Sequence, residues 1–552
     1  MKHIAVKPLL AAMLSLPFAA QAATTPDAGS LLQQIKPQAA PAPSSSGTGL
    51  KIEPQGKSQA PASTAFEVKH IRVIGNTLFD TAALHALVAD GEGKKLDLAG
   101  LDELAARITD FYHRHGYPLA RAIIPAQTVS DGVLTIQVIE ARYGKIKLNN
   151  RSPVNKLLLD ETLSPLHSGQ VVQQQDMNHA LLLLSDIPGV AINATLKPGA
   201  AVGTSDLDVQ ATSKGRVAGN VFADNYGNRY TGKTRAGATV NFLNPLHHGD
   251  VLGATVLASG SGFDYGRLSY DTLLNGRGTR LGGAYSAVHY VLGDTLAALQ
   301  AHGTAQVASL WAKQPFVRSP NLNLYGQLEY DQKTLRDRVD TSGTRTDRHL
   351  DNWVLSFNGD LRDTWLSGGV NTWSLALTSG HVGYDNTIAA AVDSASVKTQ
   401  GSFSKWNANY ARHQALNANN ELYLALAGQW SNKNLDSAQK MSVGGPYTVR
   451  AYDMGAISGD SGYVGNLELR HQLGAQWRTT LFVDTAHVTI NRTPWTTGIN
   501  SATLNGAGIG VNWSGPAQWY AQAYVATRIG SVPTLIANTS TTHAWVVLGK
   551  GF

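Results

Sequence analysis

The 552-residue chain contains no cysteine, which excludes disulfide bonds, thiolate metal sites and cysteine nucleophiles. The absence of thiols also fits a protein that passes through the oxidising periplasm. Charged residues are scarce, at 15% of the chain against roughly 25% in ordinary soluble domains. The net charge of +6 comes without a dense run of lysine or arginine. It therefore indicates a solvated surface or a basic lumen, and we expect no nucleic-acid partner.

Long apolar runs are also missing. No apolar run of 18 or more residues follows the N-terminus, as a helical membrane protein would require. At the N-terminus, Lys2 and Lys7 precede an apolar stretch from Pro8 to Ala20, and Ala20-Gln21-Ala22 has the small-x-small pattern of a cleavage site. This stretch is too short to span a membrane, so residues 1–22 are predicted to be a secretory signal peptide.

Motifs of enzyme active sites are absent as well. The chain has no Gly-x-Ser-x-Gly elbow, and Gly506-Ala507-Gly508-Ile509-Gly510 lies in a predicted strand with no helix after it, so it is not a dinucleotide loop. The histidines of His113-Arg114-His115 and His247-His248 are expected to be solvated rather than metal ligands. We expect no catalytic residue, no metal and no cofactor.

Short alternating strands dominate residues 211–552. In Leu422-Tyr423-Leu424-Ala425-Leu426 the leucines share one face, as in a strand with one apolar and one polar side. A final strand that ends in the aromatic Phe552 suits a barrel whose last strand closes on its first. The pattern predicts an outer-membrane transmembrane β-barrel of sixteen antiparallel strands, wide enough for an aqueous channel. The predicted strand centres are Asn220, Ala238, Thr255, Leu268, Tyr285, Val307, Gln327, Phe357, Leu375, Asn407, Leu424, Leu467, Val483, Ile509, Ala523 and Leu548.

A short helix is predicted within residues 23–36. Asp27 can cap it, and Leu31, Leu32 and Ile35 share one face. Residues 37–65 are rich in Pro, Ala, Ser, Gly and Gln and are typical of a flexible linker. These residues alone support equally a mobile helix on a flexible tether and a disordered N-terminus.

Two small α/β modules are predicted between the linker and the barrel. Residues 66–142 and 143–210 each fit a strand, two helices and two further strands. A sheet covered by helices on one face can keep an open edge that adds a strand from an extended polypeptide. A pair of rigid spacers is the alternative, and the residues by themselves favour it slightly.

The longest predicted loop spans residues 431–460 and contains a single arginine, Arg450, among apolar and small residues. This setting indicates a buried cation that needs a carboxylate partner. Asp484 is expected to supply it, because Leu481 and Val483 share the face that suits lipid and Asp484 then points inward. Two independent lumen charges in water are the alternative, and the residues by themselves favour it.

At this point the chain resembles the outer-membrane transporters of two-partner secretion, of the haemolysin-activator and filamentous-haemagglutinin-transporter type. Segments in one order along the chain carry the resemblance: Gly116–Ala122, Asp131–Glu140, Leu181–Val190, Gly203–Leu207, Asp224–Asn228 and Asn244–Leu246. The resemblance implies that 66–142 and 143–210 are polypeptide-transport-associated (POTRA) domains and that the helix of 23–36 is a plug in the pore of a sixteen-stranded barrel.

The resemblance also implies a lock between loop and wall. The family's Val-Arg-Gly-Tyr loop motif maps onto Val449, Arg450, Ala451 and Tyr452, and its Phe-x-Asp-x-Gly strand motif maps onto Phe482, Asp484 and Ala486. Both family glycines are alanine here, which puts the closest backbone contacts in question. Arg450 and Asp484 are expected to hold the loop inside the barrel.

The function implied is a pore in the outer membrane, with POTRA domains in the periplasm, that exports a large unfolded partner protein without nucleotide or metal. The cargo is left open among an adhesin, a cytolysin, a haem-scavenging protein and a contact-dependent toxin. Outer-membrane lipid and the barrel-assembly machinery that inserts the chain are the other expected partners. An insertase that folds other barrels is the main alternative; a simple porin and a barrel enzyme are weaker ones.

Overall fold

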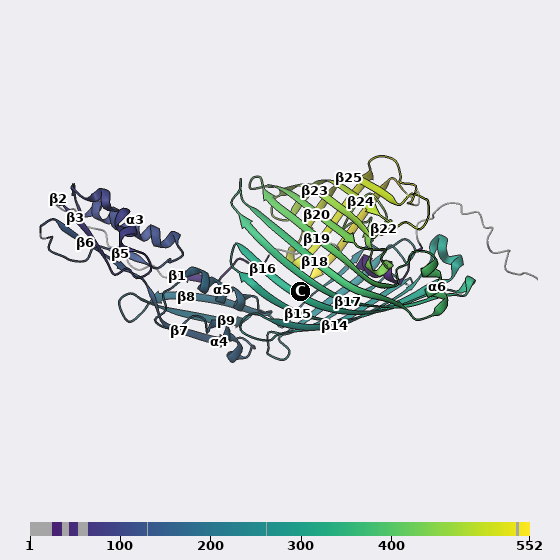
Figure 1. Ribbon diagram of the computed structural model, residues 1–552, viewed down its shortest axis with the longest axis horizontal. Coiled ribbons are helices and arrows are strands. Elements are labelled where there is room, and N and C mark those ends of the chain that lie inside the picture. The colour runs from purple at the N-terminus through teal and green to yellow at the C-terminus, as the bar shows by residue number, and fades with distance from the viewer. Residues whose placement is uncertain (1–24, 36–43, 53–64, 130, 261, 537–539) are drawn as a thin grey trace, which may run out of the picture.

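The computed structural model describes residues 25–35, 44–52, 65–129, 131–260, 262–536 and 540–552; the predicted signal peptide lies outside these residues. Figure 1 shows two small α/β modules in series at one end of a wide barrel. The N-terminal helix α1 (Ala28–Ile35) lies apart from the modules, inside the barrel, where it contacts strands of the wall. The prediction of a barrel preceded by an α/β region and an N-terminal helix is confirmed.

Sixteen antiparallel strands close into one barrel. Each predicted strand centre lies within one of them: β10 (Val217–Asp224), β11 (Arg235–Leu243), β12 (Val251–Ala258), β13 (Phe263–Leu273), β14 (Arg280–Val291), β15 (Ala301–Arg318), β16 (Leu322–Val339), β17 (Thr344–Asp363), β18 (Gly369–Tyr384), β19 (Gly401–Ala415), β20 (Asn420–Ser431), β23 (Ser461–Leu473), β24 (Trp477–Thr489), β25 (Ser501–Ser514), β26 (Trp519–Arg528) and β27 (Thr542–Gly551). Closure satisfies the backbone hydrogen-bonding groups that an open edge would leave unpaired in lipid.

Closure occurs between the first and last strands. β10 pairs with β27 from Asn220 opposite Gly551 to Asp224 opposite Val547. The terminal Phe552 extends this ladder, because its backbone N–H donates to the carbonyl of Gly219 and its carbonyl accepts from the N–H of Gly219, both at 3.0 Å.

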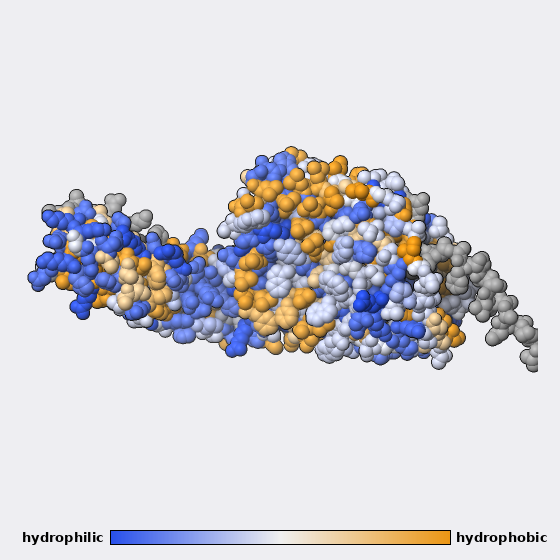
Figure 2. Space-filling model, turned by 45° about the horizontal axis from the view of Figure 1, so that its top comes forward, coloured by the Kyte–Doolittle hydropathy of each residue, from blue (hydrophilic) through white to orange (hydrophobic). Residues whose placement is uncertain are grey.

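The barrel wall carries apolar side chains outward. On β24, Leu481 and Val483 are exposed, whereas Phe482 and Asp484 between them are buried in the lumen. The same alternation recurs around the barrel because successive side chains of a strand point to opposite faces. Figure 2 shows hydrophobic residues gathered over parts of the barrel wall, while the modules are largely hydrophilic. Among the described residues, no helix is both long enough and apolar enough to cross a membrane.

The first module runs from β2 to β6. Its elements are β2 (Phe66–Val68), β3 (His70–Ile74), α2 (Thr81–Ala86), β4 (Lys94–Leu96), α3 (Leu98–Arg114), β5 (Arg121–Ile123) and β6 (Val133–Ile139). A three-stranded sheet in the order β3-β6-β5 packs against α3, whose Leu101, Leu104, Ile108 and Tyr112 are buried. Residues 66–74 form two short strands, β2 and β3, and the first of them pairs with β4.

The second module contains β7 (Arg142–Arg151), α4 (Lys156–Leu163), α5 (Gln174–Ser185), β8 (Val190–Pro198) and β9 (Thr204–Ser213). Its sheet has a fourth strand from outside the module, β1 (Leu50–Ile52), which lies in the predicted linker and pairs in parallel with β8. The expectation of a structureless linker over 37–65 is therefore wrong for residues 50–52. Alternating Leu50 and Ile52 fit a strand, and an edge with unpaired N–H and C=O groups was available to receive it.

The second module is fixed to the barrel by an ion pair whose arginine is buried. Arg318, at the end of β15, donates from Nε and Nη2 to both carboxylate oxygens of Asp186, at 2.6 and 2.8 Å. Nη1 of Arg318 also donates to Asn323, which in turn donates to Asp360. Since the Arg318 side chain is fully buried, this bidentate pair fixes the orientation of the module against the barrel mouth.

A buried carboxylate organises the first module. Glu140 accepts hydrogen bonds from the backbone N–H groups of Thr77 (2.7 Å) and Leu78 (2.9 Å) and from the hydroxyl of Tyr112 (2.8 Å). Burial raises the pKa of the Glu140 carboxyl, but these hydrogen bonds outweigh it and hold the pKa below its ordinary value.

Replacement of Glu140 by Ala is expected to lower the free energy of opening of the first module by about 2–4 kcal/mol, because buried donors lose their acceptor. Amide hydrogen exchange in the detergent-solubilised full chain measures this value, with the exposed Glu67→Ala on β2 as control. Glu140→Gln is also expected to lower the free energy of opening of the first module at pH values above 4.5, the ordinary carboxyl pKa. This difference from the intact chain should shrink as the pH falls below 4.5, because protonated Glu140 then resembles the amide. Equal opening energies of Glu140→Ala and the control would contradict this role.

Candidate functional site

The lumen is filled by the loop that joins β20 to β23, residues 432–460. The loop contains a short hairpin, β21 (Met441–Val443) and β22 (Ile457–Gly459), and a 3-10 turn, Ser437–Gln439. Val449, Ala451 and Tyr452 are buried in one apolar cluster with wall residues of β24, β25 and β27. A connection between two strands at the rim has thus folded back into the barrel.

Arg450 holds this loop to the wall. Its Nε and Nη2 atoms donate to the two carboxylate oxygens of Asp484, at 2.9 and 2.7 Å, and its backbone N–H donates to Asp484 at 3.0 Å. Asp484 is completely buried and Arg450 nearly so. The structure therefore brings together the two residues that the sequence paired. The bidentate geometry fixes the backbone of the loop as well as its side chain.

A second carboxylate, Glu468 on β23, was missed by the sequence reasoning. It accepts from Nη1 of Arg450 at 2.7 Å and from Nε of Arg470 at 2.8 Å. Asn466, on the same strand, donates to Asp484 and to the carbonyl of Thr448. The inward spacing of Asn466, Glu468 and Arg470 along one strand is the signal that would have revealed this polar row.

Aromatic rings enclose the guanidinium. Its carbon lies 3.4 Å from the ring centroid of Phe482 and 4.9 Å from that of Tyr524. The indole N–H of Trp545, on the last strand, donates to the Arg450 carbonyl at 2.7 Å. The loop is thus fastened to three separate wall strands, and the two ring faces add cation–π contacts to the guanidinium.

The two alanines at the positions of the family glycines, Ala451 and Ala486, both fit into the packing around the loop. The methyl group of Ala451 faces Gly506 on β25, where a Cβ atom would lie only 2.6 Å from the Cβ of Ala451. Gly506 is paired with Asp484 in the ladder, so the glycine directly beside the lock leaves room for this methyl group. Ala486 is buried within the apolar cluster of the loop. The loop enters the barrel with both methyl groups present.

The helix α1 is the second segment inside the lumen. Leu31 and Leu32 are buried, and Ile35 packs against the same apolar cluster, which includes Val307, Leu335 and Phe403 of the wall. Its N-cap, Asp27, accepts the backbone N–H of Ser30 at 2.8 Å. The apolar face expected from the sequence is thus turned toward the wall.

Arg348 on β17 joins this helix to both wall and loop. The guanidinium lies 2.8 Å from Asp27, 2.6 Å from Asp337 on β16 and 2.6 Å from Asp436 in the loop. Asp337 also accepts the first backbone N–H of the helix, from Ala28, at 2.8 Å. From the sequence Asp27 is expected only to cap the helix, because no local pattern indicates a partner 321 residues away.

The helix and the loop touch directly. Gly29 lies against the turn of residues 437–439, where a Cβ atom would stand 2.3 Å from Oγ of Ser437. Ser437 donates to Asp27 at 2.6 Å, and the side-chain amide of Gln33 donates to the carbonyl of Ala438. The helix and the loop therefore form one polar and apolar filling of the lumen, a contact that needs a glycine at position 29.

Comparison with known proteins gives two family matches. The model for the POTRA domain, ShlB-type, matches residues 66–141. The model described as haemolysin secretion/activation protein ShlB/FhaC/HecB matches residues 203–513, more than half of the chain.

Individual proteins are similar along most of their length. The heme/hemopexin transporter protein HuxB of Haemophilus influenzae is 26% identical, covering 81% of this chain and 80% of its own. The outer membrane transporter CdiB of Escherichia coli is 25% identical over 72% of this chain and 67% of its own. A solved structure of CdiB from Escherichia coli has the same fold, with a TM-score of 0.68 at 20% identity, over 95% of this chain and 96% of that one.

Loss of the Arg450 side chain is expected to destabilise the loop strongly. Arg450→Ala leaves Asp484 buried without its cation, while Glu468 keeps Arg470, at a cost of about 3–5 kcal/mol. Glu468→Gln is expected to cost less, because the bidentate pair with Asp484 remains. The temperature at which the barrel loses its compact migration in detergent gels, together with protease access to residues 444–455, measures both effects.

Arg492→Ala is the matched control, since this arginine is exposed in the loop after β24. A protected loop and an unchanged unfolding temperature in both Arg450→Ala and Asp484→Ala would contradict the lock.

Proposed function

This chain belongs to the haemolysin secretion/activation protein family ShlB/FhaC/HecB, and on that premise we propose how its lumen serves export. The chain is an outer-membrane transporter of the two-partner secretion type, with its POTRA domains in the periplasm. The observation that carries the proposal is the nature of the lumen filling. The residues that close the sixteen-stranded pore belong to a loop and a tethered helix rather than to wall side chains alone, so the pore can be cleared without rebuilding the wall.

The helix is held in a way that allows it to leave. Arg348 faces three carboxylates, and departure of α1 removes only Asp27. Asp337 and Asp436 then still compensate the guanidinium, so no unpaired buried charge remains behind. In contrast, release of Arg450 would leave the fully buried Asp484 without its cation, because only Glu468 has a second arginine, Arg470. We therefore assign α1 as the removable plug and the loop as the segment that stays attached to the wall.

The exported polypeptide is proposed to dock on the second POTRA domain by strand addition. The edge of β8 already accepts an extended segment, since β1 pairs along it from Leu50 opposite Ala194 to Ile52 opposite Leu196. An arriving strand that replaces β1 gains the same backbone hydrogen bonds. Because β1 and α1 lie on one N-terminal segment, its release frees the tether of the plug.

The linker also marks the barrel entrance. Ser44 donates its backbone N–H to Asp360 at 2.9 Å, and Arg362 donates to its carbonyl. The domain–barrel ion pair of Asp186 and Arg318 reaches the same Asp360 through Asn323. Displacement of the linker thus removes a partner from the network that positions the domain at the mouth.

The cargo is proposed to be a large secreted protein that is the dedicated partner of this transporter. The name of HuxB points to a heme/hemopexin-related partner in that relative, and an adhesin, a cytolysin or a contact-dependent toxin fits the same route. Threading and folding outside require no catalytic residue of this chain. An insertase role is less supported, because both curated relatives are called transporters.

Deletion of the gene is expected to remove one large protein from the cell surface or the medium, because each transporter of this type serves a dedicated partner. Mass spectrometry of surface and medium proteins, with and without the gene, identifies that cargo. Complementation by the intact chain should restore it. A broad loss of outer-membrane barrels would instead indicate an insertase, and no change at all would contradict the proposed export.

Weaker binding of the helix α1 in the lumen is expected to raise the ion conductance of the chain in planar bilayers. Asp27→Asn removes one charge-assisted contact worth about 1.5–3 kcal/mol, which shifts the plug equilibrium by about tenfold or more. Deletion of residues 23–35 should give the fully open value. The control is Asp97→Asn, which changes the same kind of N-cap in α3, outside the barrel. Conductance of the deletion equal to that of the intact chain would contradict the plug assignment.

A further inference from the structure

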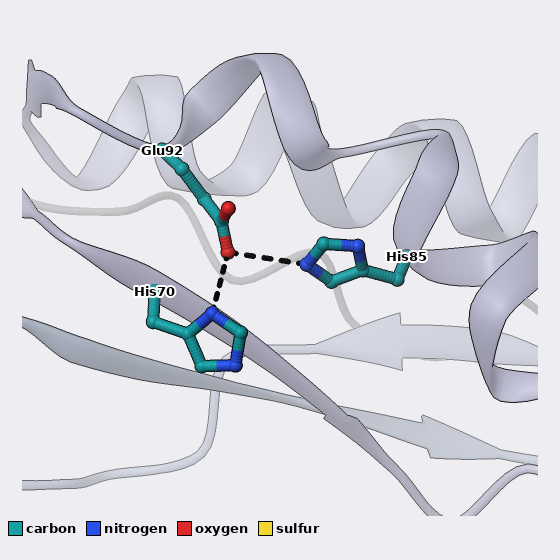
Figure 3. Close-up of side chains that lie close together, drawn as sticks. All are labelled: His70, His85 and Glu92. Carbon is teal, nitrogen blue, oxygen red and sulfur yellow. Dashed lines mark hydrogen bonds and ion pairs between the residues drawn. The ribbon is translucent and has the colours of Figure 1, made fainter.

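Two histidines and a glutamate meet on the surface of the first POTRA domain. His70 lies on β3, His85 in the last turn of α2, and Glu92 follows the 3-10 turn Ala89–Gly91. Figure 3 shows both imidazole rings turned toward the same carboxylate. Among the described residues, this is the one group of three or more histidine, aspartate or glutamate side chains whose ligand atoms all lie within 4.8 Å of one another.

The geometry is close to that of a bound divalent cation. Nδ1 of His70 lies 2.9 Å from Oε1 of Glu92, and Nε2 of His85 lies 3.1 Å from the same oxygen. A tetrahedral zinc ion with ligand distances of about 2.0–2.2 Å holds its ligand atoms about 3.4 Å apart. Since all three ligand atoms already lie within 4.8 Å of one another, small movements of the side chains would replace the shared hydrogen bonds by metal bonds.

The position of Glu92 is fixed from another side. Its Oε1 atom also accepts the backbone N–H of Ile71, at 2.7 Å. That N–H belongs to β3, which is the outer strand in the order β3-β6-β5. The carboxylate therefore covers part of a free sheet edge, where an extended polypeptide would otherwise add.

The donor set selects the metal. Two imidazoles and one carboxylate, with no thiolate in the chain, form the His2Glu set of open zinc sites. The side chain of His70 is 61% exposed, so water can reach a fourth position. Each imidazole binds as the neutral ring, with its proton on Nε2 of His70 and Nδ1 of His85, away from the ion.

We propose that His70, His85 and Glu92 bind one zinc ion that ties β3 to α2 and fixes Glu92 over the edge of β3. The bound ion stiffens the first POTRA domain and closes this edge to strand addition. Strand addition to the edge of β8 in the second domain is unaffected, so zinc makes the docking of extended segments more selective.

The test is a zinc titration of the tag-free full chain in detergent by calorimetry, followed by cobalt substitution and visible spectroscopy. One equivalent of Zn²⁺ is expected to bind to the intact chain, and Co²⁺ is expected to give the absorption of a four-coordinate site. His85→Gln and Glu92→Gln are expected to weaken this binding by at least about tenfold. Glu92→Gln keeps an acceptor for Ile71, so the domain retains its fold.

His167→Gln is the matched control, because His167 is an exposed histidine of the second POTRA domain. Amide exchange of residues 66–96 supplies a second readout: zinc should slow it in the intact chain and in His167→Gln, but not in His85→Gln. Absence of a one-to-one site in the intact chain, or equal zinc affinity in all four proteins, would overturn the proposal and leave the cluster as a pair of histidine–carboxylate hydrogen bonds.

Discussion

Buried guanidinium groups hold the contents of this barrel in place. A barrel of sixteen strands is too wide to be filled by its own wall residues, so segments from elsewhere must enter a lumen that water would otherwise occupy. Arg450 fastens the loop to Asp484 and Glu468, and Arg348 fastens the helix through Asp27. Both rely on planar donor groups that bind carboxylates in a fixed orientation. Each of the two segments inside the barrel is therefore held by one buried arginine.

The two arginines differ in what their release would cost. The cation of Arg450 belongs to the loop and its carboxylates to the wall, whereas the cation of Arg348 belongs to the wall and only one of its carboxylates, Asp27, to the segment of the helix. Without the loop, Asp484 would be buried with no cation, whereas without the helix Arg348 would still face Asp337 and Asp436. This asymmetry follows from which side carries the cation, and it makes the helix the less costly segment to remove.

The second POTRA domain, the barrel mouth and the lumen all contact the N-terminal part of the chain that contains α1, Ser44 and β1. β1 occupies an edge of the second POTRA domain, Ser44 lies at the barrel mouth, and α1 fills the lumen. One stretch of chain thus touches the docking edge, the entrance and the pore. The first POTRA domain has its own edge, where Glu92 covers β3 and two histidines lie beside it. In each POTRA domain a sheet edge that could bind an extended polypeptide is thus covered, that of β8 by β1 and that of β3 by Glu92.

The sequence by itself determined the barrel. Period-two alternation placed all sixteen strand centres, because a strand between lipid and lumen must alternate its side chains. It also singled out Arg450 and Asp484, since a lone cation in an apolar loop needs a partner. Glu468, Arg348 and Gly506 emerged only from the tertiary structure, because each acts on a segment distant in sequence. The same holds for β1, whose three residues carry too little pattern to show a strand. Its structure comes from the edge of β8, and only folding brings that edge within reach.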